Sequence, residues 1–97
     1  MTAEETQAFV DCVAHNDVPI RFAGKLYWCL GPTDFEGEAG FRVRVYEADS
    51  ETYEATRCLL NYVGPSVEAC MRHFLEDRYW EGRSFYEVAA EMSWVDL

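Results

Sequence analysis

The sequence predicts an α+β domain: an N-terminal helix, an antiparallel meander sheet of three or four strands, and two C-terminal helices packed on the sheet. Three observations predict this class. Apolar residues recur at helical spacing near both ends of the chain, they alternate at strand spacing in the middle, and Gly or Pro turn signals separate these runs. With 97 residues, 49% of them hydrophobic, we expect residues 1–97 to form one acidic domain.

The first helix is expected to begin after Thr2, because Thr2 and Glu5 match the Ser/Thr-x-x-Glu capping box. Apolar residues then follow at helical spacing as far as about Ala14, and these are Ala8, Phe9, Cys12 and Val13. Asn16 and Asp17 are expected to end the helix.

Two strands, 18–22 and 26–30, are expected around a hairpin turn at 23–25. A three-residue loop would put on one face Val18, Ile20, Phe22, Leu26, Trp28 and Leu30. A two-residue loop, which hairpins prefer, would put Tyr27 and Cys29 on that face instead. In both cases the second strand is apolar on both faces, so it is central or presents an aromatic surface.

A third strand is expected over 41–47, where apolar and polar residues alternate. The core face would carry Phe41, Val43 and Val45, and the outer face would carry Arg42, Arg44 and Tyr46. Residues 51–63 fit a helix by apolar spacing, but their β-branched and aromatic content and a turn signal at 48–50 fit a hairpin. The hairpin is preferred, because a fourth strand lets the sheet bury a wider face.

Two helices are expected near the C-terminus. Ser66 caps the first, whose apolar stripe is Val67, Cys70, Met71, Phe74 and Leu75. Ser84 and Glu87 form a second capping box before a short helix marked by Phe85, Val88, Ala89 and Met92. Trp94 and Val95 are expected to fold back onto the core.

Charge is the most unusual property of the chain. Eighteen Asp and Glu against eight Lys and Arg give a formal net charge of −10. Such a charge repels nucleic acid and anionic membranes, so neither is an expected direct ligand. The chain shows no secretory signal pattern and no apolar run long enough to span a membrane, so a cytoplasmic location with four reduced cysteines is expected.

The sequence does not predict an enzyme, a cofactor or a metal site. His15 and His73 are the only histidines, and no nucleophile motif or phosphate-binding loop accompanies them. The pairs Cys12/His15 and Cys70/His73 have the Cys-x-x-His spacing that two neighbouring helices could offer to zinc. Apolar-stripe cysteines need no metal to explain them, however, and Cys29 and Cys58 are interpreted as core or partly buried residues.

The preferred functional interpretation is a non-enzymatic inhibitor or adaptor that binds a basic protein. Two acidic segments, residues 34–38 and 47–54, suggest it, because alternate residues of an extended chain lie roughly 6–7 Å apart and could mimic a row of phosphates. The expected contact residues are Asp34, Phe35, Glu36, Glu38, Tyr46, Glu47, Asp49, Glu51, Tyr53 and Glu54. Anti-CRISPR and anti-restriction proteins of phages and mobile elements are the class expected, with a nucleic-acid-binding effector as partner.

The alternative interpretation is a small homo-oligomeric interaction domain, for example a homodimer, that uses an exposed aromatic patch. Tyr79 and Trp80 are the surface candidates for it, because they lie in a charged break between helices. Trp28 and Trp94 are expected to be core or partly buried residues.

Overall fold

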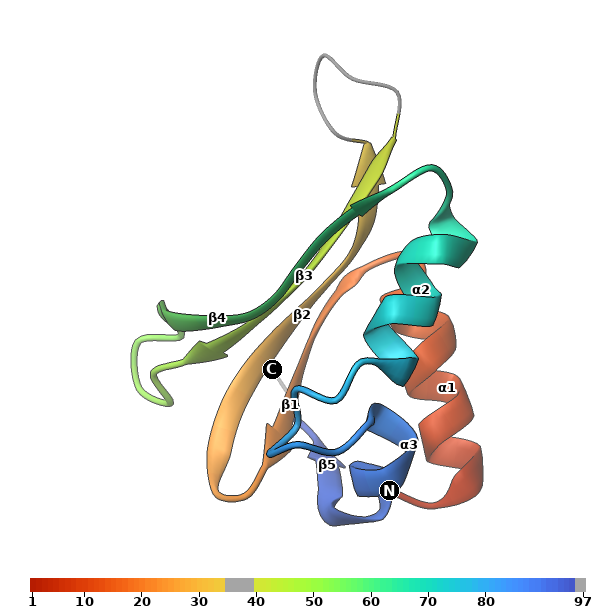
Figure 1. Cartoon of the computed structure of the whole chain (residues 1–97). Helices are drawn as coiled ribbons and strands as arrows, with labels where there is room; N and C mark the ends of the chain where they lie inside the picture. The colour runs from red at the N-terminus through yellow and green to blue at the C-terminus, as the bar shows by residue number, and fades with distance from the viewer. Residues whose placement is uncertain (35–39, 96–97) are drawn as a thin grey trace.

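The computed structural model describes residues 1–34 and 40–95, and it has the predicted α+β class. An antiparallel five-stranded sheet has the strand order β4-β3-β2-β1-β5, and the three α-helices pack on one of its faces (Figure 1). The elements in chain order are α1 (Ala3–Val13), β1 (Asp17–Phe22), β2 (Lys25–Asp34), β3 (Phe41–Ala48), β4 (Ala55–Gly64), α2 (Val67–Glu76), α3 (Phe85–Val88), the 3-10 helix η1 (Ala89–Glu91) and β5 (Met92–Trp94). No described helix is long and apolar enough to cross a membrane.

The capping box predicted for α1 is confirmed. The Thr2 hydroxyl accepts a hydrogen bond from the Glu5 amide at 3.1 Å, and the Glu5 carboxylate accepts one from the Thr2 amide at 2.9 Å. The buried stripe differs from the predicted one and consists of Thr6, Phe9, Val10 and Val13, while Ala8 is exposed. Relative to the predicted facing, α1 is rotated so that Val10 is buried in place of Ala8. Burial of the larger Val10 side chain removes more apolar surface from water than burial of Ala8 would.

The β1–β2 hairpin has the two-residue loop, Ala23–Gly24, with positive φ angles of 53° and 75°. The resulting register places Ile20 opposite Tyr27. Tyr27 and Cys29 are therefore buried on the helix-covered face, and β2 lies in the middle of the sheet. Gly31 of β2 lets α1 approach closely, because a Cβ there would lie 1.9 Å from the carbonyl oxygen of Val13.

The segment 51–63, which fitted both a helix and a hairpin, contributes to strand β4, as the preferred hairpin interpretation predicts. β4 pairs with β3 along its length, with register shifts near each of two β3 positions, Tyr46 and Ala48. The facing predicted for β3 is confirmed in the core, where Val43 and Val45 are fully buried. A strand is favoured here over a helix because pairing with β3 places Leu60 opposite Val45, where both side chains are buried.

The prediction that the last helix includes Met92 is wrong. The predicted capping box at Ser84 and Glu87 is present, but α3 ends at Val88, and Met92 begins β5, opposite Phe22 of β1. A three-residue strand is too short to show an alternating pattern, so the sequence gives no signal for it. Trp94 folds back as predicted, with its ring edge-to-face to that of Phe9 at a centroid distance of 5.3 Å.

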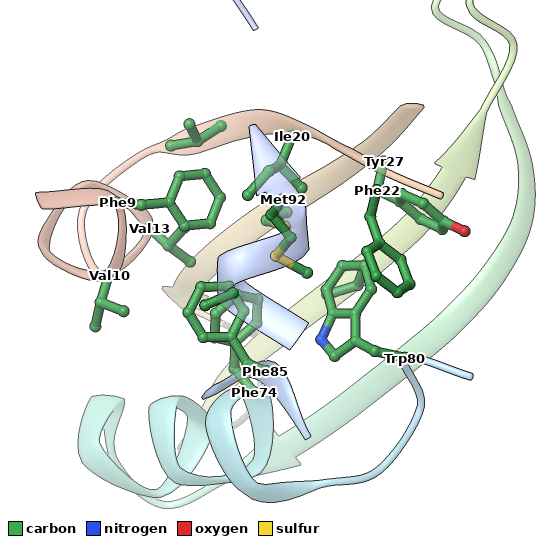
Figure 2. Packing of buried hydrophobic residues seen from close by; sticks show 14 of the residues in the cluster. Phe9, Val10, Val13, Ile20, Phe22, Tyr27, Phe74, Trp80, Phe85 and Met92 are labelled. Carbon is green, nitrogen blue, oxygen red and sulfur yellow. The ribbon is translucent and has the colours of Figure 1, made fainter. Parts of the chain in front are cut away.

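The prediction that Trp80 is a partly exposed surface residue is also wrong, since Trp80 retains 1% of its accessible surface. Backbone hydrogen bonds join Trp80 and Arg83 in both directions across a turn at Glu81–Gly82, where both φ angles are positive. This reversal turns the indole inward, where it meets the rings of Phe22 and Tyr27 at centroid distances of 5.8 and 5.1 Å (Figure 2).

Replacing Trp80 with alanine should therefore destabilise the fold by about 3–5 kcal/mol, the range for emptying a buried aromatic site. The matched control is Tyr86→Ala, because Tyr86 is 55% exposed on the helix side, and it should cost less than about 1 kcal/mol. The measurement is chemical denaturation followed by circular dichroism. Equal losses in the two variants would contradict the packing described for Trp80.

Candidate functional site

The face of the sheet opposite the helices carries an open hollow of about 360 Å³. We call it the aromatic hollow, and its lining residues are Asp17, Trp28, Leu30, Tyr46, Tyr53 and Ala55. Strand register explains how four of them meet: Trp28 lies opposite Tyr46 on β3, and Leu30 lies opposite Asp17 on β1. Because alternate residues of a strand share a face, the register that buries Tyr27 and Cys29 turns Trp28 and Leu30 toward this hollow.

The aromatic side chains of the hollow are accessible. Tyr53 is 41% exposed, and Trp28 and Tyr46 are partly exposed. Within the described ranges, the three rings make no ring-to-ring contact with one another, and all three line the hollow. Two predicted contact residues, Tyr46 and Tyr53, are thus brought together, and the hollow adds Trp28, which had been assigned to the core or its margin.

The β3–β4 loop, residues 49–54, holds Tyr53 in place. The Asp49 carboxylate accepts hydrogen bonds from the amides of Glu51 at 2.8 Å and Thr52 at 3.0 Å. The Tyr53 amide donates to the Asp49 carbonyl at 2.8 Å, and Tyr53 itself has a φ of 62°. The loop amides stabilise the ionised carboxylate and hold the pKa of Asp49 below its usual value, so this residue shapes the loop.

The second acidic segment does not form the predicted row of evenly spaced charges. Its residues 49–54 form a closed loop, and the extended spacing of alternate side chains does not apply to it. Glu47 lies at 3.5 Å from Lys25 and 3.4 Å from Arg57, which neutralise much of its charge. Glu51 and Glu54 remain exposed, and no ion pair involves them in the described part of the chain.

Asp34 and Tyr79, two further predicted contact residues, are not among the residues that line the hollow. Asp34 is exposed at the end of β2, while Phe35, Glu36 and Glu38 lie outside the described residues. Tyr79 is half-buried beside Trp80, and its hydroxyl donates a hydrogen bond to the Phe74 carbonyl at 2.7 Å. Burial raises the pKa of Tyr79 well above the usual tyrosine range.

Two missed lining residues, Trp28 and Leu30, could have been found from the sequence. Their assignment depended on the length of the β1–β2 loop, and the two-residue alternative already turned them away from Tyr27 and Cys29. The contribution of Asp17 could not have been found in this way, because the sequence placed it at the end of a helix. In the structure it is the first residue of β1, opposite Leu30.

The histidines and cysteines do not converge. The His73 Nδ1 lies 2.9 Å from the Asp77 carboxylate, and its ring stacks on Tyr62 at a centroid distance of 3.7 Å. His15 is exposed, while the Cys70 thiol is buried and donates to the Phe41 carbonyl at 3.4 Å. In residues 1–34 and 40–95, no three His, Cys, Asp or Glu side chains are grouped so that they could hold a metal ion.

All four cysteines are free thiols. Cys29 is buried as predicted, and burial raises the pKa of its thiol. Cys58 is exposed on β4, so its assignment to the core or its margin is wrong. The reason is that β4 lies at the edge of the sheet, where the outward side chains are uncovered.

Comparison of the chain with protein-family models, with curated proteins and with solved structures gives no match.

Acid should weaken the fold through three carboxylates held by backbone amides, those of Glu5, Asp49 and Glu87. Hydrogen bonds from the amides of Thr2, of Thr52 and Glu51, and of Ser84 lower their respective pKa values. The stabilisation is complete above the ordinary pKa values of 4.5 and 3.8, and it disappears as the pH falls through the lower folded-state values. We therefore expect the melting temperature to decline below about pH 4.5.

The matched variant is E5Q/D49N/E87Q, which keeps an acceptor oxygen at each position but cannot ionise there. Its melting temperature should depend less on pH over the same acidic range. A decline as steep as that of the parent would show that other groups dominate acid unfolding.

Proposed function

We propose that this chain is a non-enzymatic inhibitor or adaptor that binds a basic, nucleic-acid-handling protein. The supporting observation is the aromatic hollow on the helix-free face of the sheet. Exposed Trp and Tyr side chains are enriched at the energetic centres of protein interfaces, because they provide a large contact area at low entropic cost. The helix layer already covers the opposite face, so binding at the hollow would not compete with the core.

The charge of the chain favours a basic partner. A net charge of −10 attracts a positively charged groove over long range and repels phosphate. Near the hollow, Asp17, Glu51 and Glu54 are exposed, and no described residue forms an ion pair with them. We propose that these acids, rather than an extended row, meet the cationic surface of the partner.

The proposed mode of action is stoichiometric occlusion. The chain would occupy a site that otherwise binds DNA or RNA, as anti-CRISPR and anti-restriction proteins of phages and mobile elements do. Turnover has no part in this proposal.

The test is competition for labelled DNA or RNA bound to candidate effectors from the host. The parent should displace nucleic acid at about one equivalent. The E51K/E54K variant should associate more slowly and displace less, with the greatest difference at low salt, because exposed charges act mainly by steering. The fold should be nearly unaffected, since such charges contribute little to stability.

The matched control, D11K/E76K, makes the same change of charge on α1 and α2, on the other side of the sheet. It should retain more activity than E51K/E54K at the same salt concentration. If the two variants behave alike, net charge alone acts and the hollow side is not the contact surface. If the parent displaces nucleic acid from no effector, the proposed function is wrong.

One observation favours a second candidate, a homo-oligomeric interaction domain. β4 is a ten-residue edge strand whose only charged residue is Arg57, and Val63 on it is 45% exposed. Long edge strands with few charges offer unpaired backbone groups to a second copy. In this alternative, two copies would pair through their β4 edges.

If β4 pairs with a second copy, dilution should dissociate a dimer, and C58K/V63K should be monomeric because Lys on an edge opposes strand pairing. W28A/Y53A serves as the comparison, because it alters the aromatic hollow and leaves the edge intact. Sedimentation velocity over a range of concentrations measures both variants. A parent that is monomeric at every concentration excludes this alternative, and a dimer lost only in W28A/Y53A would assign self-association to the hollow.

A further inference from the structure

The aromatic hollow has the composition of a cation-binding cage. Three aromatic side chains, from Trp28, Tyr46 and Tyr53, share it with one carboxylate, that of Asp17. We propose that the hollow receives the side chain of an arginine or lysine from the partner, a proposal that rests on the proposed function and specifies its central contact. The ligand class is thus an alkyl-guanidinium or alkyl-ammonium group.

The chemistry of the lining favours a cation over a neutral group. The faces of Trp and Tyr rings carry negative electrostatic potential and attract Lys or Arg within about 6 Å. The Asp17 carboxylate makes no ion pair or side-chain hydrogen bond with any described residue, so its charge is available to an incoming cation. Leu30 and Ala55 complete the lining with apolar surface, against which the methylene stem of Lys or Arg can pack.

The size of the hollow agrees with this ligand. Its volume of about 360 Å³ is at the lower end of the range for small-ligand sites, roughly 300–1,000 Å³. A side chain that enters from a partner therefore fits better than a large cofactor. Because all three rings line the hollow, a head group bound in it would lie against their surfaces.

Arg44 already makes a cation–π contact with one of the rings that line the hollow. Its guanidinium carbon lies 5.9 Å from the centroid of the Tyr46 ring, so this ring already takes part in one cation–π contact. Arg44 is not among the residues that line the hollow. Its positive charge nevertheless opposes the binding of a second cation. We therefore expect the Asp17 carboxylate to strengthen, and the Arg44 guanidinium to weaken, the binding of a cationic ligand.

The rival ligand is single-stranded nucleic acid, whose bases stack on aromatic side chains in positively charged grooves. Arg44 beside Tyr46 would suit that ligand. The net charge of −10 and the carboxylate of Asp17 in the lining oppose it. The observations therefore favour the cation, and nucleic acid becomes one outcome of the test.

The test titrates the full chain with short Gly-Arg and Gly-Lys peptides, the same peptide with citrulline in place of arginine, and an oligothymidylate. Amide chemical shifts at 50 mM and 200 mM salt report both affinity and location. We expect the cationic peptides to bind and to shift resonances of the hollow. The neutral citrulline peptide should bind at least several-fold more weakly, and the oligonucleotide should not bind.

Variants test the geometry. D17N and, separately, W28A or Y53A should weaken the cationic peptide about two- to fivefold, the factor that corresponds to one exposed cation–π or charge contact. R44Q should strengthen it, because it removes an opposing charge. The controls are D11N and Y86A, which make equivalent changes to exposed residues on the helix side. Melting curves close to that of the parent show that a variant is folded.

Equal binding of the arginine and citrulline peptides would overturn the proposal, as would a loss of binding in R44Q together with no effect of D17N. Binding of the oligonucleotide at the hollow would overturn it in favour of base stacking. If the cationic peptides do not bind while the chain still displaces nucleic acid from an effector, the cage is wrong and the proposed function stands.

Discussion

The two-residue turn at Ala23–Gly24 is the constraint on which the arrangement of this molecule depends. Both residues have positive φ angles, and the turn sets Ile20 opposite Tyr27. Because side chains alternate along a strand, a shift of one residue would exchange every side chain of β2 between the two faces. The turn therefore decides at once that Tyr27 packs in the core and that Trp28 faces the hollow.

The hydrophobic cluster under the helices follows from this register. Tyr27 and Phe22 form the wall against which Trp80 packs, and Phe9, Phe74 and Phe85 fill the space under the helices (Figure 2). Since the buried cluster under the helices provides a continuous apolar core, the opposite face can keep Trp and Tyr side chains partly exposed. We therefore expect variants of the aromatic hollow to remain folded.

The sequence predicted those features that depend on neighbouring residues. Both capping boxes, the alternation of β3 and the stripe of α2 around Cys70 and Phe74 need only local spacing, and all are present. The predictions that the structure corrects concern features with a different origin. Trp80 is buried because a turn after it reverses the chain, β5 exists because β1 offers it an edge, and residues 49–54 close into a loop because Asp49 binds their amides. Such long-range or side-chain-to-backbone contacts leave no periodic signal, whereas the facing of Trp28 and Leu30 was implicit in the two-residue loop.

Charge and shape would contribute differently to the proposed recognition. Salt screens exposed charges over about 8 Å at physiological ionic strength, so the net charge of −10 can guide an approaching basic surface but discriminates poorly among basic surfaces. Short-range contacts have to supply the discrimination, and these depend on rings held at fixed positions. Trp28 and Tyr46 are held by paired strands, and Tyr53 by the loop amides that Asp49 binds. In the proposed recognition, Asp49 and Asp17 would therefore act at different steps. Asp49, which shapes the loop, would order the site before binding, and Asp17, which lines the hollow, would contact the ligand.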